Sequence, residues 1–145
     1  MALLILSFAV GLALSLQTAI NRQLSVQLSS SLHAALISFS VGTALLFLLV
    51  LIQPSSLRSW QSLTQMPYYL WFGGALGVYA ICVSIYSAPQ LGLLSLSGLI
   101  IFGQVLMSMC IDHFGWLGSP IYPIQWQRLL GAVLIGIGVL LTFIR

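Results

Sequence analysis

Long apolar segments separated by short polar stretches run through the whole of this 145-residue chain. The segments cover residues 2–20, 33–52, 68–88, 91–111 and 127–144. Each is close to the roughly 17–25 apolar residues that a helix needs to cross the hydrocarbon core of a bilayer, and the last is the shortest. Barrel strands need only about ten residues of alternating character, which these segments do not show. The pattern predicts five transmembrane helices in a single domain, residues 1–145.

Small polar residues and prolines mark the expected boundaries of these helices. Residues 25–31 form a small polar connector after the first segment, and Gln53-Pro54 ends the second. Proline lacks a backbone donor and biases the preceding residue away from the helical conformation. Pro89-Gln90 is the only interruption between the third and fourth segments, so we expect a tight turn between antiparallel neighbours. Residues 112–127, rich in glycine and proline, form the last loop.

Charged residues are almost absent, which decides the class of protein. They are Arg22, Arg58, Asp112, Arg128 and Arg145, so the charged fraction is 3%, with 60% hydrophobic residues. A soluble domain is charged at roughly a quarter of its positions. Five charges cannot build a water-facing surface, and no basic cluster exists to bind nucleic acid. The sequence therefore predicts an all-α integral membrane protein whose solvent is the lipid bilayer.

The arginines do not favour either orientation in the membrane. With five crossings, Arg58 and Arg128 lie on one side while Arg22 and Arg145 lie on the other, and arginine excess is what normally fixes orientation. We therefore expect the chain to insert in both orientations, unless a partner or helix hydrophobicity sets one orientation. Two oppositely inserted copies would form an antiparallel homodimer of ten helices, resembling the inverted repeats of many transporters.

Polar side chains in the first two segments are candidates for cavity or packing roles. Gln17 and Asn21 share one helical face; Gln17 is expected to face a cavity, whereas packing or capping is an equal alternative for Asn21. Ser38 is a further cavity candidate. It belongs to a stripe with Ala34 and Gly42, where small residues favour close helix packing.

Two tyrosines and a polar stripe occupy the third and fourth segments. Tyr79 and Tyr86 are two turns apart and would stack on a flat or cationic substrate if they line a cavity; core packing is the alternative. The stripe consists of Ser97, Gln104, Ser108 and Asp112, spaced by seven, four and four residues. This spacing places all four on one face, so we expect Gln104 and both serines to line a cavity.

Asp112 is the only acidic residue, and two roles are open for it. As a structural group it would pair with Arg128 or Arg22, or with its own loop, and Arg128 is the best candidate because it opens the next helix on the same side. Alternatively, it would couple transport to protons if the helix end reaches the cavity. Neither cofactor nor metal is indicated, because Cys82 and Cys110 lie in apolar segments without ligand spacing.

Several motifs occur along the chain: Gln17 with Asn21, residues 35–39 with Gly42, Gly73-Gly74 with Gly77, Gly103-Gln104 with Ser108, residues 111–115 with Gly118, and residues 128–131. Together they resemble the YdcZ-type family of inner-membrane exporters. The resemblance covers nearly the whole chain. It implies a multi-pass protein of the bacterial inner membrane and a half-sized member of the drug/metabolite transporter superfamily. Larger members have two inverted five-helix halves, in which the fifth helix is peripheral.

The resemblance implies a small-molecule exporter but no particular substrate. Small multidrug exporters of four helices carry a glutamate in their first helix, where this chain has Gln17 and no acid, so the same proton–cation exchange is unsupported. A non-transporting subunit of a larger membrane complex is the second hypothesis. An enzyme using Asp112-His113 is disfavoured, because no nucleophile, metal cluster or phosphate-binding loop accompanies the pair.

Overall fold

A computed structural model describes residues 1–52 and 67–144. Within that part the chain is helical, with no strand. The elements are α1 (Ala2–Leu28), α2 (Ser31–Ile52), η2 (Tyr68–Trp71), α4 (Phe72–Leu91), α5 (Leu93–Phe114), η3 (Trp116–Gly118) and α6 (Trp126–Leu141). They form two compact units, Met1–Pro89 and Gln90–Arg145, which are described separately. The predicted all-α class is confirmed.

Four of the helical segments are long and apolar enough to cross a membrane: α1, α2, Tyr68–Leu91 and α5. The fifth, α6, has 16 residues, which corresponds to about 24 Å at 1.5 Å per residue. It ends at Leu141, earlier than the predicted limit of residue 144. Trp126 and Arg128 belong to its first turn. The crossing of the bilayer by α6 stays a prediction.

In the first unit, α1 extends through part of the predicted polar connector and ends at Leu28. Residues 25–28 contain neither glycine nor proline, so nothing in them prevents helix continuation. Ser29 then takes a left-handed conformation with φ 51°. The Ser30 N–H donates to the Ser25 carbonyl (3.1 Å), a bond that satisfies one of the last helical carbonyls. The Ser30 hydroxyl accepts from the His33 N–H and caps α2.

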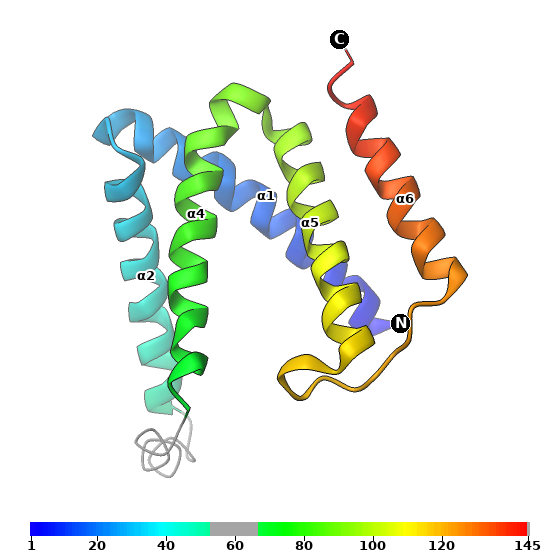
Figure 1. Cartoon of the computed structure of the whole chain (residues 1–145). Coiled ribbons are helices and arrows are strands. Elements are labelled where there is room, and N and C mark those ends of the chain that lie inside the picture. Colours follow the sequence, from blue (N-terminus) through cyan, green and yellow to red (C-terminus); the bar gives the residue numbers. More distant parts are fainter. Residues whose placement is uncertain (53–66, 145) are drawn as a thin grey trace. The chain divides into compact units, whose positions relative to one another are not determined.

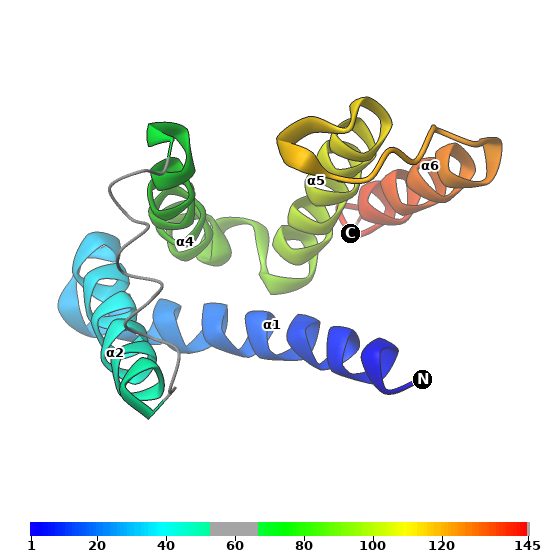
Figure 2. The same ribbon diagram turned by 90° about the horizontal axis from the view of Figure 1, so that it is seen from below.

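The core of the first unit joins side chains of α1, α2 and α4. Ala34, Ala35 and Ile85 are buried, and Leu24, Ile81 and Cys82 pack around them. Small side chains permit the close approach of helices that membrane proteins use instead of a large hydrophobic core. From their shared corner, α1 and α2 splay apart, as Figure 2 shows.

Helix α4 does not end at Pro89, contrary to the expected turn at Pro89-Gln90. Pro89 lies inside the helix, whose last residue is Leu91. Its missing donor affects only the final turn, so the cost of a proline in a helix interior is reduced. The chain turns at Gly92, where φ is 78° and ψ is 153°, a region open almost only to glycine.

The second unit is an antiparallel hairpin of α5 and α6, which lie side by side in Figures 1 and 2. Near its open end the Ser95 hydroxyl donates to the Thr142 carbonyl (3.2 Å). Close contact needs glycine here: a Cβ on Gly136 would lie 3.0 Å from the Phe102 ring. The contact agrees with a packing role for the fifth helix, but α6 also forms one side of the pocket described below, which a purely peripheral helix would not.

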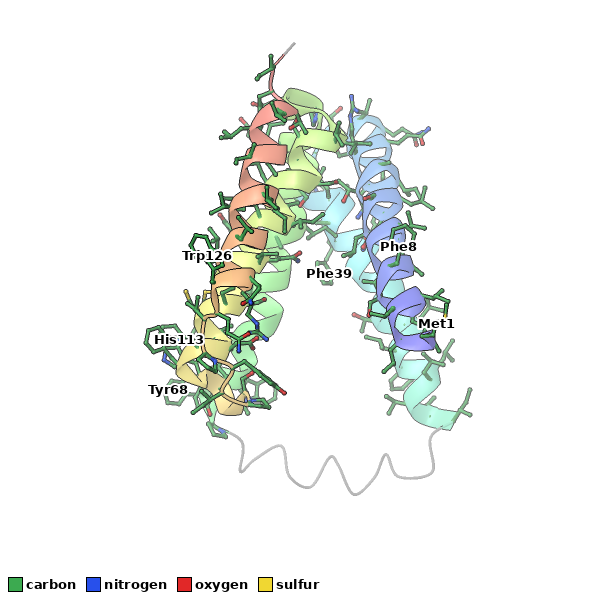
Figure 3. All side chains as sticks on the ribbon, turned by 90° about the vertical axis from the view of Figure 1, so that its right-hand side faces the viewer. Met1, Phe8, Phe39, Tyr68, His113 and Trp126 are labelled. Carbon is green, nitrogen blue, oxygen red and sulfur yellow. The ribbon has the colours of Figure 1, made fainter. Side chains whose placement is uncertain are left out.

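Large apolar side chains remain exposed over most of the described surface. Phe8 is 70% exposed on α1, and Figure 3 shows it together with Met1 and Phe39 projecting from their helices. Contiguous apolar surface of this extent is unfavourable in water. It is suited to lipid and to contacts with other helices.

Candidate functional site

Three members of the polar stripe on α5 line a groove between α5 and α6. Gln104, Ser108 and Asp112 face it from α5, and Arg128 faces it from α6. Its volume is about 380 Å³. The remaining lining residues are apolar or small: Ile101, Val105, Met109, Gly131, Ala132 and Ile135. We refer to this feature as the α5–α6 groove.

Local helical geometry explains both the stripe and the opening beside it. Residues four apart on a helix lie on the same face, one turn above the other, so Gln104, Ser108 and Asp112 form a continuous row. On α6, Gly131 leaves open space, because a Cβ added there would meet nothing within 4 Å. The groove is therefore polar along one wall and apolar elsewhere.

An ion pair occupies one end of the groove. Arg128 Nη1 and Asp112 Oδ2 are 3.4 Å apart, and their side chains are 41% and 33% exposed. The Arg128 guanidinium also lies over the Tyr122 ring, 5.3 Å from its centre. A carboxylate near a helix C-terminus is unfavourable against the helix dipole, so the neighbouring cation compensates for it. Of the alternatives open from the sequence, the structure shows Arg128 as the partner.

The loop between the two helices holds this end in place. The Tyr122 N–H donates to the Asp112 carbonyl (2.8 Å), and the Ile124 N–H donates to His113 Nδ1 (3.2 Å). Gly115 ends α5 with φ 62°. Figure 3 labels His113 near the end of α5 and Trp126 at the start of α6, the two sides of this loop. Backbone bonds therefore fix Tyr122 beside Arg128.

The other candidates from the sequence do not line this groove. Ser97 is half-buried on α5, outside the groove lining. In the first unit, Gln17, Tyr79 and Tyr86 are exposed, and Ser38 is half-buried. Of the predicted set, only Gln104, Ser108 and Asp112 are brought together at one described site. A cavity role for the rest stays a prediction.

Among the candidate residues of the first unit, Asn21 differs in being buried. It is only 4% exposed, and its amide nitrogen Nδ2 is buried without a hydrogen-bond partner. A buried polar group left unpaired costs about 1–3 kcal/mol. If Asn21 capped a helix, its amide would have a hydrogen-bond partner. The Asn21 Nδ2 donor finds no acceptor among residues 1–52 and 67–144.

Arg128 is the groove residue that sequence reasoning missed as a lining group. From the sequence, Arg128 is expected only as a partner for Asp112 and as an orientation signal. Its position in the first turn of an apolar helix, directly after an aromatic loop, is the signal that would have placed it near the stripe. No group of three or more His, Cys, Asp or Glu side chains that would hold a metal occurs in residues 1–52 and 67–144.

The apolar helices and the partly polar groove together define an integral membrane protein with a candidate path or binding site for small molecules. The family model described as "Putative inner membrane exporter, YdcZ" matches residues 2–141. The chain therefore belongs to this family of the inner membrane, as its motifs suggested, and the family's transport role implies that it is not an enzyme. Neither a curated protein nor a solved structure matches the chain.

Proposed function

We propose that this protein exports a small molecule by alternating access, as an antiparallel homodimer of the drug/metabolite transporter type. The α5–α6 groove is the observation that carries the proposal. Polar side chains within membrane helices are costly and concentrate where substrates or ions pass. Gln104, Ser108 and Asp112 form such a row beside open space on an otherwise apolar helix pair.

The balance of arginines supports two oppositely inserted copies. Arg22 and Arg145 oppose Arg58 and Arg128 if all five helices cross the bilayer, so neither orientation is favoured. Transporters with inverted repeats place their substrate site at the interface of the repeats. A second copy of this chain would supply the missing repeat.

The buried amide of Asn21 also supports the presence of a second copy of the chain. Its Nδ2 donor has no acceptor within residues 1–52 and 67–144. An acceptor from the second copy or from a substrate would remove the cost of leaving it unpaired. We therefore assign Asn21 to the proposed dimer interface or substrate path.

Reporter fusions test the orientation. A compartment-sensitive reporter fused to the C-terminus should give signal on both sides of the membrane. Substituting Ser59→Lys beside Arg58 should drive the N-terminus to the cytoplasm, and the matched control Gln23→Lys beside Arg22 should drive it the opposite way.

A non-transporting subunit of a larger complex is the alternative function. Such a subunit needs one fixed orientation, so a reporter signal on only one side in the unsubstituted protein would contradict the antiparallel homodimer. A parallel dimer or a different partner would then take its place.

A further inference from the structure

The chemistry of the α5–α6 groove changes along its length. Asp112 and Arg128 lie at the end next to the loop, whereas Ile101 and Ile135 lie toward the other end. At 1.5 Å per residue, Asp112 and Ile101 are separated along α5 by about 16 Å. The groove is therefore charged at one end and apolar at the other, with Gln104 and Ser108 between, and its length is comparable to half the hydrocarbon core, which is about 30 Å thick.

Aromatic residues place the charged end at the level of the lipid headgroups. Trp116, Tyr122 and Trp126 lie in the loop or at the start of α6, and all three are at least half exposed. Tryptophan and tyrosine prefer the membrane–water interface. From that level, the apolar part of the groove extends into the hydrocarbon region.

The ion pair at this end keeps unused hydrogen-bonding capacity. A guanidinium has five N–H donors, and a carboxylate has two acceptor oxygens. Within the described chain, Arg128 bonds one carboxylate oxygen, Asp112 Oδ2, through a single 3.4 Å contact. Both side chains are partly exposed, so a headgroup with an acidic oxygen and an amine can reach Arg128 and Asp112 together.

We propose that the α5–α6 groove binds a phospholipid of the phosphatidylethanolamine class. The phosphate contacts Arg128, the ammonium donates to Asp112, and one acyl chain lies along Ile101, Val105 and Ile135. Gln104 and Ser108 supply hydrogen bonds to the ester region. The proposal rests on the proposed function in taking this groove as the substrate path, and it names an amphipathic lipid as the substrate class.

Charge complementarity favours this lipid over other bilayer lipids. A guanidinium donates strong charge-assisted hydrogen bonds to phosphate oxygens, which accounts for Arg128. Asp112 would repel a headgroup that carries only negative charge, as in phosphatidylglycerol. The quaternary ammonium of phosphatidylcholine has no N–H to donate to the carboxylate. A primary amine fits both residues.

Native mass spectrometry of the full-length protein in detergent tests this binding. Equal amounts of phosphatidylethanolamine, phosphatidylglycerol and phosphatidylcholine with the same acyl chains are added, and the retained adducts are counted. The unsubstituted protein should retain phosphatidylethanolamine about tenfold more than phosphatidylcholine, a ratio within the range of one good polar contact.

Two glycines on α6 provide a matched pair of variants. A Cβ on Gly131 or Gly138 would meet nothing within 4 Å, but only Gly131 lines the groove. Gly131→Leu should fill the groove and abolish lipid retention, whereas Gly138→Leu should keep it. Asp112→Asn should remove the preference for the amine lipid, and Arg128→Gln should weaken all phosphate lipids.

Several results would overturn the proposal. Equal retention in Gly131→Leu and Gly138→Leu would show that the lipid binds elsewhere, and equal retention of the three lipids would remove the headgroup assignment. Loss of the dimer together with the lipid in Gly131→Leu alone would make the groove a contact with the second copy. Lipid retention with a one-sided reporter signal would instead contradict the transporter dimer and leave the lipid site standing.

Discussion

The carboxylate of Asp112 and the guanidinium of Arg128 are 3.4 Å apart. This ion pair links the only acidic residue of the chain, near the end of α5, to the first turn of α6. Both residues line the α5–α6 groove. The Tyr122 ring beside Arg128 and the backbone bond from Tyr122 to Asp112 complete a cluster of three residues. This cluster has a structural role and is also part of the proposed ligand site, and substitutions can distinguish the two roles.

Asp112→Asn should lower the free energy of unfolding by at most about 1 kcal/mol, since the ion pair is partly exposed and screened. The pH dependence of transport should not change if Asp112 is structural. Thermal unfolding in detergent and gradient-driven transport measure the two effects. Arg128→Gln is the control for loss of the pair. A folded Asp112→Asn variant that binds lipid but no longer responds to a pH gradient would instead identify Asp112 as a proton-coupling group.

Gly115→Ala should destabilise the hairpin loop by about 1–2 kcal/mol, the cost of a left-handed conformation for an L-residue. The added Cβ would also lie 2.8 Å from Ile121 Cγ1, so the loop must shift. Gly118→Ala is the matched control, because Gly118 has a similar φ of 77° but open space around the added Cβ. Thermal unfolding of both variants should show the larger loss for Gly115→Ala; equal losses would mean that the contact with Ile121 is unimportant.

Asn21→Leu should weaken the dimer while leaving the isolated chain no less stable. Removing an unpaired buried donor relieves a cost of about 1–3 kcal/mol in the single chain but would delete the proposed bond to the second copy. Gln17→Leu, at an exposed position one turn away on α1, should change neither property by more than about 0.5 kcal/mol. Cross-linking or mass photometry in detergent measures the dimer fraction. An unchanged dimer in Asn21→Leu would place the missing acceptor in a substrate or elsewhere.

Gln104→Leu should abolish transport without affecting expression or dimer formation, because Gln104 is exposed in the groove. Transbilayer movement of acyl-labelled phosphatidylethanolamine in proteoliposomes, followed by chemical quenching of the outer label, measures transport. Gly103→Ala is a suitable control, since its added Cβ meets nothing within 4 Å and Gly103 does not line the groove. A simultaneous loss of the dimer in Gln104→Leu would indicate a packing residue.

Local sequence signals predicted some parts of the site and missed others. The spacing of Gln104, Ser108 and Asp112 placed them on one face, and the structure brings them into one groove. The same spacing included Ser97, which lies outside the groove lining because the wall of the groove depends on which α6 residues stand opposite. Sequence spacing defines a face of one helix but does not define the neighbour that covers it.

The ends of the helices also could not be predicted from local sequence signals alone. Ser25 and Pro89 were expected at interruptions, yet both lie within helices, whose ends are set by the conformations of Ser29 and Gly92. Small polar residues and a proline in the last turn weaken a helix by amounts that hydrogen bonds and packing outweigh.

The sequence by itself determined the solvent, the helical class, the family and the balance of arginines, because each follows from hydropathy, charge or motifs along the chain. Only the tertiary structure decided that Arg128 pairs with Asp112, that Gly131 leaves a groove open, and that Asn21 is buried without a partner. These properties depend on which side chains meet across two helices. Burial and pairing are relations between distant positions, and no local pattern contains them.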